Sequence, residues 1–461
     1  MAEAGGIGPY DPDVNEIDGL MRQTRLRRFA SRGRVRAEMS DPSPPADAEI
    51  APDTSTRALL RERDYLCFWG ARFVGTLGVQ IQAVALGWQV YAIARQTMSV
   101  GESAFMVSMI GLAQFVPLFL LTLLAGETAD RRTRKHIAMI TLGIDIVSVL
   151  ILFFLAIRGI HALWPIFVVA VFFGASRAFM APATGAMGPM LVPRPLLPRA
   201  IAWNALAWQA GSIVGPALGG LLLVHSAGLA FGGAAALYVV GLLLLSAIRR
   251  PTKPEAQPGS RLELIKEGLA YVWNNKIVFG SISLDLFAVI LGGATALLPV
   301  FARDVLHIGP GGFGLLRASP AIGATLVGLY LASQPIRRHA GRIMFAGVFV
   351  FGAATVVFGL SKLVWLSVAS LAVLGGADML SVYVRQTLVQ IVTPDAMRGR
   401  VSAVSGVFIS ASNELGEVES GAVAWLLGPV GAAVFGGLGA MVVTGTWAWL
   451  FPALRKADRL E

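Results

Sequence analysis

The stretch Gly126-Glu127-Thr128-Ala129-Asp130-Arg131-Arg132-Thr133-Arg134-Lys135 decides how the rest of the sequence is interpreted. It separates two apolar runs, at about 103–125 and 137–157, each long enough to cross a bilayer. Lys and Arg remain on the cytoplasmic side during insertion, so this basic loop is expected there. Many such clusters are only topological anchors. That role would explain the cations, but not a glycine that permits close backbone approach, followed by an aspartate that can face the positive end of a neighbouring helix.

The loop resembles the cytoplasmic signature of the major facilitator superfamily, G-x-x-x-D-R-x-G-R-K, which joins the second and third helices of that fold. The matching positions are Gly126, Asp130, Arg131, Arg134 and Lys135. The sequence departs from the pattern at Thr133, where the family usually has glycine. The geometry of the turn is therefore left open by the sequence.

Composition limits the class of protein. The chain has 461 residues, of which 55% are hydrophobic and only 14% are charged, and repeated apolar stretches predict an all-α polytopic membrane protein. The net charge of +10 does not indicate nucleic acid, because the Lys and Arg residues fall in alternate loops. A single cysteine, Cys67, excludes an internal disulfide and a cysteine metal cluster. We find no catalytic or metal-binding pattern, and we predict neither an enzyme nor a cofactor.

The apolar pattern predicts twelve transmembrane helices in two six-helix halves. We expect them at 67–93, 103–125, 137–157, 163–190, 200–224, 228–248, 277–302, 312–334, 342–361, 363–390, 400–427 and 430–451. The expected domains are a disordered basic tail over 1–56, six-helix bundles over 57–248 and 277–451, a linker over 249–276 with an amphipathic helix at Arg261–Asn274, and a tail over 452–461. Lys and Arg concentrate in the loops that share a side with both termini, so both termini should be cytoplasmic. The family resemblance implies that this membrane is a bacterial inner membrane.

The two halves repeat in sequence. A shift of 201 residues places Pro193 and Arg199 on Pro394 and Arg400, and Gly174 on Gly375. Repeats of this kind are typical of transporters that bind a substrate between the halves near the bilayer midplane. The repeat therefore predicts transport rather than signalling or catalysis.

Charged residues inside apolar spans are costly and usually face a partner or a wet cavity. Arg72, Arg177, Asp285 and Asp378 lie in the first, fourth, seventh and tenth spans. In the superfamily these four helices line the central cavity, so the resemblance implies four ionisable groups around one pathway. They could contact substrate or form two static pairs that lock the halves together. We expect Asp285 to pair with Arg72 or Arg177.

Two acids in the eleventh span, Glu414 and Glu417, are three residues apart and share a helix face. Neighbouring carboxylates in a medium of low dielectric rarely both ionise, so one of them could carry a proton. Alternatively, they lie nearer the membrane surface, or they pair with Arg317 or Arg400. Protons are the expected coupling ion, carried by one of these acids or by Asp285 or Asp378.

The fifth span contains a glycine pattern with a proline inside it. Glycines four apart serve ordinary close helix packing, and proline adds a kink. The pattern also resembles the antiporter signature G-x-x-x-G-P-x-x-G-G of superfamily exporters. The matching positions are Gly211, Gly215, Pro216, Gly219 and Gly220. This resemblance favours efflux over uptake.

Two segments resemble the enterobactin-exporter-like (transmembrane secretion effector) branch of the superfamily: Asp285–Asp304 and Ser412–Glu417. We therefore predict a proton-coupled exporter of a small organic molecule, drug-like or siderophore-like, that works as a monomer in contact with membrane lipid. The alternatives are an importer on the same fold and a non-transporting receptor or scaffold. The sequence leaves the identity of the substrate open.

Overall fold

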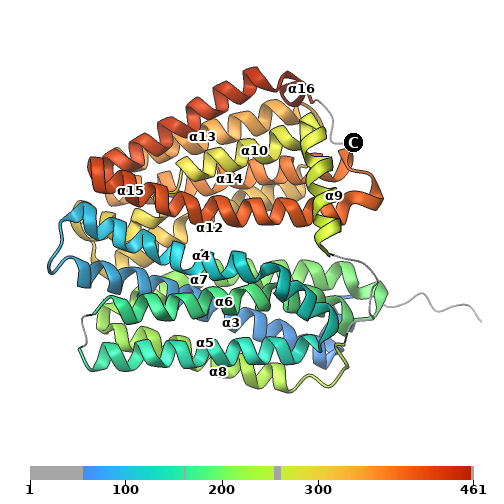
Figure 1. Cartoon of the computed structure of the whole chain (residues 1–461), viewed down its shortest axis with the longest axis horizontal. Helices are drawn as coiled ribbons and strands as arrows, with labels where there is room; N and C mark the ends of the chain where they lie inside the picture. The colour runs from blue at the N-terminus through green and yellow to red at the C-terminus, as the bar shows by residue number, and fades with distance from the viewer. Residues whose placement is uncertain (1–54, 160–161, 254–260, 458–461) are drawn as a thin grey trace, which may run out of the picture. The chain divides into compact units, whose positions relative to one another are not determined.

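The structure is a computed structural model that describes residues 55–159, 162–253 and 261–457. Most of the tail predicted over 1–56 and part of the predicted linker lie outside the described residues. The described part is helical and contains no strand. Eleven of its helices are long and apolar enough to cross a membrane (Figure 1).

The N-terminal half begins with a short helix, α2, and continues with six long ones. Their bounds are α2 Thr56–Arg61, α3 Arg63–Ala94, α4 Val100–Arg131, α5 Arg134–Ile157, α6 Trp164–Met187, α7 Leu197–His225 and α8 Ala227–Ser246. Two 3₁₀ turns, Gly188–Leu191 and Arg194–Leu196, connect α6 to α7. The six predicted spans of this half agree with these helices to within a few residues.

The C-terminal half follows α9, which spans Arg261–Asn274 as predicted. Its elements are α10 Lys276–Leu291, α11 Leu298–Val300, α12 Gly309–Ser333, α13 Ala340–Leu360, α14 Val364–Val392, α15 Asp395–Leu450 and α16 Pro452–Arg455. The seventh span, predicted over 277–302, corresponds to Lys276–Val305. Within it α10 ends at Leu291, and a 3₁₀ turn at Ala294–Leu297, the short α11 and a π-turn at Phe301–Val305 complete the crossing.

The helix α15 is too long for one crossing. At about 1.5 Å per residue its 56 residues would extend over roughly 84 Å, against a hydrocarbon core of about 30 Å. Gly428 breaks it with φ 75° and ψ 168°, a conformation that glycine adopts without strain, and Pro429 follows. Figure 1 shows the two arms of α15 running back alongside the C-terminal half from this bend.

The same packing recurs in both halves. In the first half α4 packs along α6 and α3 along α7, and in the second α12 packs along α14 and α10 along α15. The repeated glycines explain part of this. Gly174 of α6 leaves no room for a side chain against the backbone of Gln114, and Gly375 of α14 does the same against Pro320. The two halves meet where α4 packs against α15 and α7 against α12.

Polar contacts fix which helix ends share a side. The Asp64 carboxylate, at the start of α3, accepts hydrogen bonds from the backbone N–H groups of Arg249 at 3.2 Å and Arg250 at 2.8 Å. The linker therefore begins beside the start of α3, and the other end of α3, at Ala94, lies on the opposite side of the membrane-spanning region.

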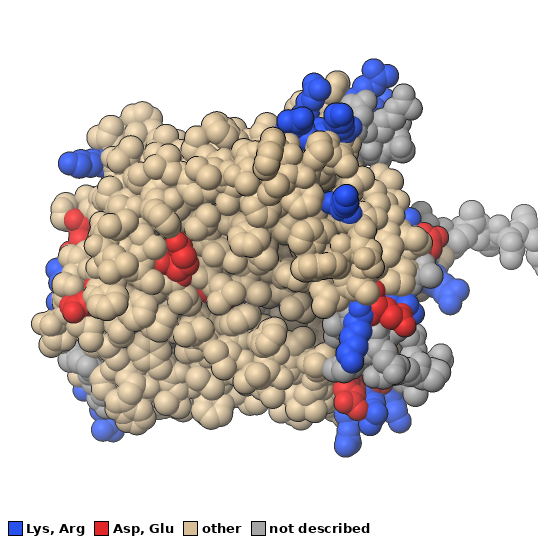
Figure 2. Space-filling model, turned by 45° about the horizontal axis from the view of Figure 1, so that its top comes forward, with Lys and Arg blue, Asp and Glu red and all other residues tan. Residues whose placement is uncertain are grey.

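The outer surface suits lipid. Large apolar side chains such as Leu120, Ile140, Leu426 and Val442 are more than half exposed, which a water-soluble protein of this size rarely shows so widely. In Figure 2, Lys and Arg gather mainly at the end where Figure 1 places α9, and the broad band between the two ends is mostly uncharged, interrupted by one group of acidic atoms. The structure therefore has the apolar belt of a multi-pass membrane protein.

Candidate functional site

A cavity of about 590 Å³ lies between the two halves. Most of its wall comes from α3, α4 and α6, and α12 and α15 of the C-terminal half complete it. Its polar and charged lining includes Arg72, Thr76, Gln80, Gln82, Gln114, Asp145, Arg177, Thr184, Arg317, Ser410, Glu414 and Glu417. Aromatic and aliphatic side chains, among them Phe68, Phe173, Trp208 and Phe313, provide the rest. A mixed wall of this size suits a small organic molecule.

An ion pair joins the halves across this cavity. Arg177 Nη1 lies 3.2 Å from Glu414 Oε1, and the same nitrogen lies 3.3 Å from Gln114 Oε1. Arg177 comes from α6 and Glu414 from α15, so the pair can form only while these faces are together. The Arg177 side chain is 49% exposed, which leaves it accessible to a molecule in the cavity.

The second acid of α15 lies beside the first. Both carboxylates approach Gly111 of α4: a methyl group there would lie 2.9 Å from Glu417 Oε2 and 3.3 Å from Glu414 Oε2. Arg317 of α12 interacts electrostatically with Glu417. The predicted shared face is therefore present, and it points into the cavity. The suggested partner Arg400 instead pairs with Glu267 of α9.

Arg72 also lines the cavity, as predicted. Its Nη1 donates to Thr184 Oγ1 of α6 at 3.1 Å, which links α3 to α6 within the N-terminal half. Asp145 of α5, which the sequence analysis did not single out, borders the same space. A lone acid within an otherwise apolar span was the signal that could have found it.

The prediction for Asp285 is wrong. Its Oδ2 lies 3.2 Å from Arg385 Nη2, not near Arg72 or Arg177, and both members of the pair are buried. Asp285 and Asp378 border a separate void of about 10 Å³ inside the C-terminal half rather than the central cavity. The helix α10 is apolar on every side, so its sequence does not show which face meets which neighbour.

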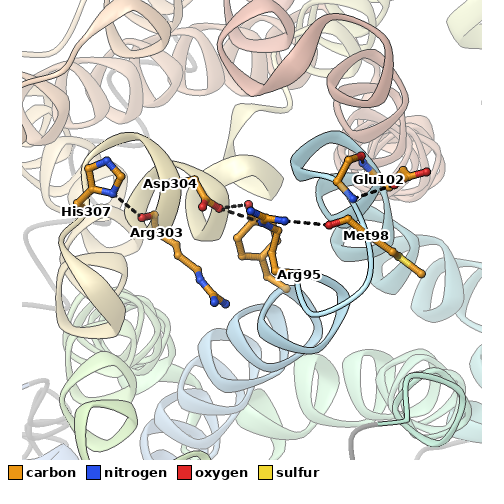
Figure 3. A network of polar contacts seen from close by, with 8 residues as sticks. Arg95, Met98, Glu102, Arg303, Asp304 and His307 are labelled. Carbon is orange, nitrogen blue, oxygen red and sulfur yellow. Dashed lines mark hydrogen bonds and ion pairs between the residues drawn. The ribbon is translucent and has the colours of Figure 1, made fainter.

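The cavity is closed at the end opposite the linker. The Tyr91 hydroxyl, in the last turn of α3, donates to Asp304 Oδ2 of the other half, and Arg95 Nε lies 3.5 Å from the same oxygen. The Arg303 guanidinium carbon lies 5.9 Å from the centre of the Tyr91 ring. Figure 3 shows Arg95 and Asp304 facing each other between the two halves, with the Arg303 side chain extending away from Asp304. We call Tyr91, Arg95, Arg303 and Asp304 the outer cluster.

Backbone contacts stabilise the outer cluster on both sides. Arg95 Nη1 donates to the carbonyl of Met98 at 2.9 Å, and His307 Nδ1 lies 3.0 Å from the carbonyl oxygen of Arg303. Asp304 lies in the π-turn that ends the seventh span. The sequence does not predict the outer cluster, because nothing in either half alone indicates that these residues meet.

The basic signature loop connects the helix ends at the linker side. Lys135 Nζ donates to the carbonyls of Ser246 and Ile248 at 2.8 and 2.6 Å, and Arg134 Nη1 donates to the carbonyl of Ala186 at 3.0 Å. Arg131 is exposed and pairs with Glu127 at 2.8 Å, while Gly126 is buried and Asp130 half-buried. Thr133 is the N-cap residue just before α5, and its φ of −62° is an ordinary value. The glycine of the family pattern is therefore not required here.

Comparison with known proteins establishes the family. The family model described as "Transmembrane secretion effector" matches residues 54–460. The chain belongs to this family of the major facilitator superfamily. The Enterobactin exporter EntS of Citrobacter koseri is 28% identical over 377 residues, covering 81% of this chain and 84% of that protein. The exporter of the same name from Escherichia coli O139:H28 matches with the same identity and coverage.

Solved structures confirm the major facilitator fold. A bacterial homologue of the iron transporter ferroportin superposes with a TM-score of 0.63 at 16% identity, covering 85% of this chain and 99% of the other. The nucleoside transporter NupG superposes with a TM-score of 0.60 at 17% identity, with the same coverage. This secretion effector family member is thus a multi-pass transporter of the bacterial inner membrane and not an enzyme.

The helix α7 is the fifth span of this transporter, and its glycine pattern makes close contacts on two sides of the helix. A methyl group at Gly211 would lie 2.7 Å from Thr76 of α3, and one at Gly219 would lie 3.1 Å from the backbone of Ile81. Gly215 faces Gln80 in the same way, and Pro216 lies within α7. Gly220 instead lies against Gly314 of α12, in the other half. The pattern therefore serves packing within one half and contact between the halves.

Proposed function

We propose that this transporter is a proton-coupled exporter of a small anionic or amphipathic organic molecule. The observation that carries the proposal is the Arg177–Glu414 pair, which crosses the central cavity and must break if the halves separate there. A substrate anion can replace Glu414 at Arg177, and a proton can neutralise the released carboxylate. Either event by itself breaks the pair and lets the halves separate, whereas the empty, paired form holds them together. A carrier that changes state only when loaded with substrate or with a proton exchanges one for the other.

We further infer twelve crossings, with Gly428 at the turn between the last two, and both termini and the linker in the cytoplasm. The bend in α15 supports the count, and the concentration of Lys and Arg at the linker end supports the orientation. In this topology the outer cluster closes the periplasmic side, and the structure corresponds to an inward-facing state. The loop around Asp130 would act as the cytoplasmic latch in the opposite state.

The relatives suggest a first probe. They are named for export of enterobactin, and the three arginines of the cavity, Arg72, Arg177 and Arg317, suit an oxygen-rich or anionic ligand. The glycine pattern of α7 supports efflux rather than uptake by its resemblance to the exporter signature. We therefore propose a siderophore-like or drug-like substrate.

The test is transport into inside-out proteoliposomes with an acidic lumen, using labelled enterobactin and a panel of amphipathic dyes. We expect accumulation of at least one probe that a protonophore abolishes, and that Arg177→Gln loses. Accumulation that is the same with and without the pH gradient would exclude proton coupling. Accumulation only in right-side-out vesicles would indicate an importer, and no flux of any probe would favour a receptor or scaffold.

A further inference from the structure

The C-terminal half contains a charged cluster that the central cavity does not reach. Asp285 of α10 and Arg385 of α14 form an ion pair of 3.2 Å, with side chains only 9% and 3% exposed. Asp378, also on α14, interacts electrostatically with both of them. These three residues are the C-half cluster.

Helix geometry explains why the three groups meet. Asp378, Ser381 and Arg385 are spaced by three and four residues, which places them on one face of α14. Asp378 and Ser381 of that face border a void of about 10 Å³ together with Asp285, and the remaining wall is apolar and includes Val348 and Phe351 of α13. A void of this size is about the smallest that can hold one water molecule.

The charges of the cluster do not balance. Two carboxylates share one guanidinium, so with both acids ionised the site holds a net negative charge in an apolar interior, which is costly. Arg385 forms the 3.2 Å pair through Nη2, while its Nε and Nη1 are buried and have no hydrogen-bond partner. The remaining donors of the only guanidinium in the cluster are therefore unsatisfied although Asp378 is close.

The charged groups on the neighbouring helices do not supply the missing charge. On α15, Glu414 and Glu417 face the central cavity and Glu419 accepts a hydrogen bond from Ser420. Arg317 of α12 also lines the central cavity. Among the described residues, Arg385 is the one cation that interacts with Asp285 and Asp378.

The ends of the remaining helices carry the other charges of this half. On α9, Glu267 pairs with Arg400, and Lys266 is exposed. At the start of α13 and the end of α16, Arg342 and Arg455 are exposed. Each of these groups lies near the membrane surface, not at the depth of the C-half cluster.

We propose that the C-half cluster is a proton-binding site, separate from the substrate cavity. Asp285 stays ionised in its pair with Arg385, and Asp378 takes up a proton from water as its carboxylate becomes a carboxylic acid. The protonated cluster is neutral, so α10 and α14 can stay packed against each other without water between them. The deprotonated cluster is charged and favours entry of water between α10 and α14. The inference rests on the proposed function in one respect: this proton would be the one whose movement drives export of the substrate.

The test measures protonated carboxyl groups directly, by infrared difference spectroscopy of the full chain in lipid nanodiscs during pH steps, without substrate. We expect wild-type protein to show a carboxylic acid band near neutral pH that is lost as the pH rises. Asp378→Asn should reduce this band by the contribution of one carboxylic acid while keeping the Asp285–Arg385 pair. Arg385→Gln should enlarge it, because both acids then lack a cation. Glu102→Gln, which changes an exposed acid, is the matched control and should keep the wild-type band.

An unchanged band in Asp378→Asn would overturn the inference, as would a band displaced by Na⁺ at constant pH. If Arg385→Gln does not fold, Asp378→Asn still decides the matter, because it removes no cation. The outcome is independent of the flux assay. If the carboxylic acid band changes in Asp378→Asn but the protein transports no probe, only the proposed function is contradicted. Proton-driven transport with an unchanged band would contradict only the proton site.

Discussion

Two Arg–carboxylate pairs of the same 3.2 Å length lie in opposite settings. Arg177–Glu414 crosses the cavity between the halves, and its arginine is half exposed, whereas Arg385–Asp285 is closed inside one half. Water screens the first pair and keeps it weak enough to exchange. The second is desolvated, so loss of either member leaves an uncompensated buried charge. Only the pair that joins the halves can open and close without unfolding a half.

The largest effect should come from the buried pair. Arg385→Leu should lower the free energy of unfolding by about 3–5 kcal/mol near neutral pH, because the buried Asp285 loses the cation with which it pairs. The loss should shrink at acid pH, where protonated carboxyls need no counter-charge. Thermal unfolding in detergent across a pH series checks both points. A loss that does not depend on pH would mean that Arg385 acts through packing alone.

The outer cluster should show an intermediate effect. Tyr91→Phe removes a hydrogen bond to a carboxylate, worth about 1.5–3 kcal/mol, from the closed state alone. The equilibrium should therefore shift toward molecules whose cavity is open on the side of Arg95. The readout is labelling of Ala296→Cys, a cavity position, by an impermeant maleimide added from that side in a Cys67→Ser background.

Tyr330→Phe is the control for this experiment, because that tyrosine is 64% exposed. Faster labelling in Tyr91→Phe and wild-type labelling in the control are expected. Equal rates in all three proteins would show that the outer cluster does not hold the cavity closed.

The smallest effect on stability should come from the pair across the cavity. Arg177→Gln should change the free energy of unfolding by less than about 1 kcal/mol, as exposed pairs do, while transport is lost. Unfolding and flux measured on one preparation separate these effects. Destabilisation comparable to that of Arg385→Leu would remove the distinction between the two pairs.

Much of the architecture could be predicted from the sequence, because crossing a bilayer requires long apolar runs and insertion sorts Lys and Arg by side. The spans and the helix at Arg261–Asn274 followed from these patterns, whereas the family followed from the resemblance of the loop at Gly126–Lys135 to a known signature. The irregular backbone inside the seventh span, after α10 ends at Leu291, could not be predicted in this way. Proline and glycine weaken a helix, but their effect inside a membrane depends on neighbours that replace the lost hydrogen bonds.

The sequence by itself determined that Arg177, Asp285, Asp378 and Glu414 lie within the membrane and therefore need partners or a wet cavity. Only the tertiary structure decided which partner each one has. Arg177 and Asp378 occupy matching places in the repeat, yet one lines the central cavity and the other a closed void. The reason is physical: in a helix that is apolar all round, hydropathy sets depth, while packing against other helices sets rotation about the axis.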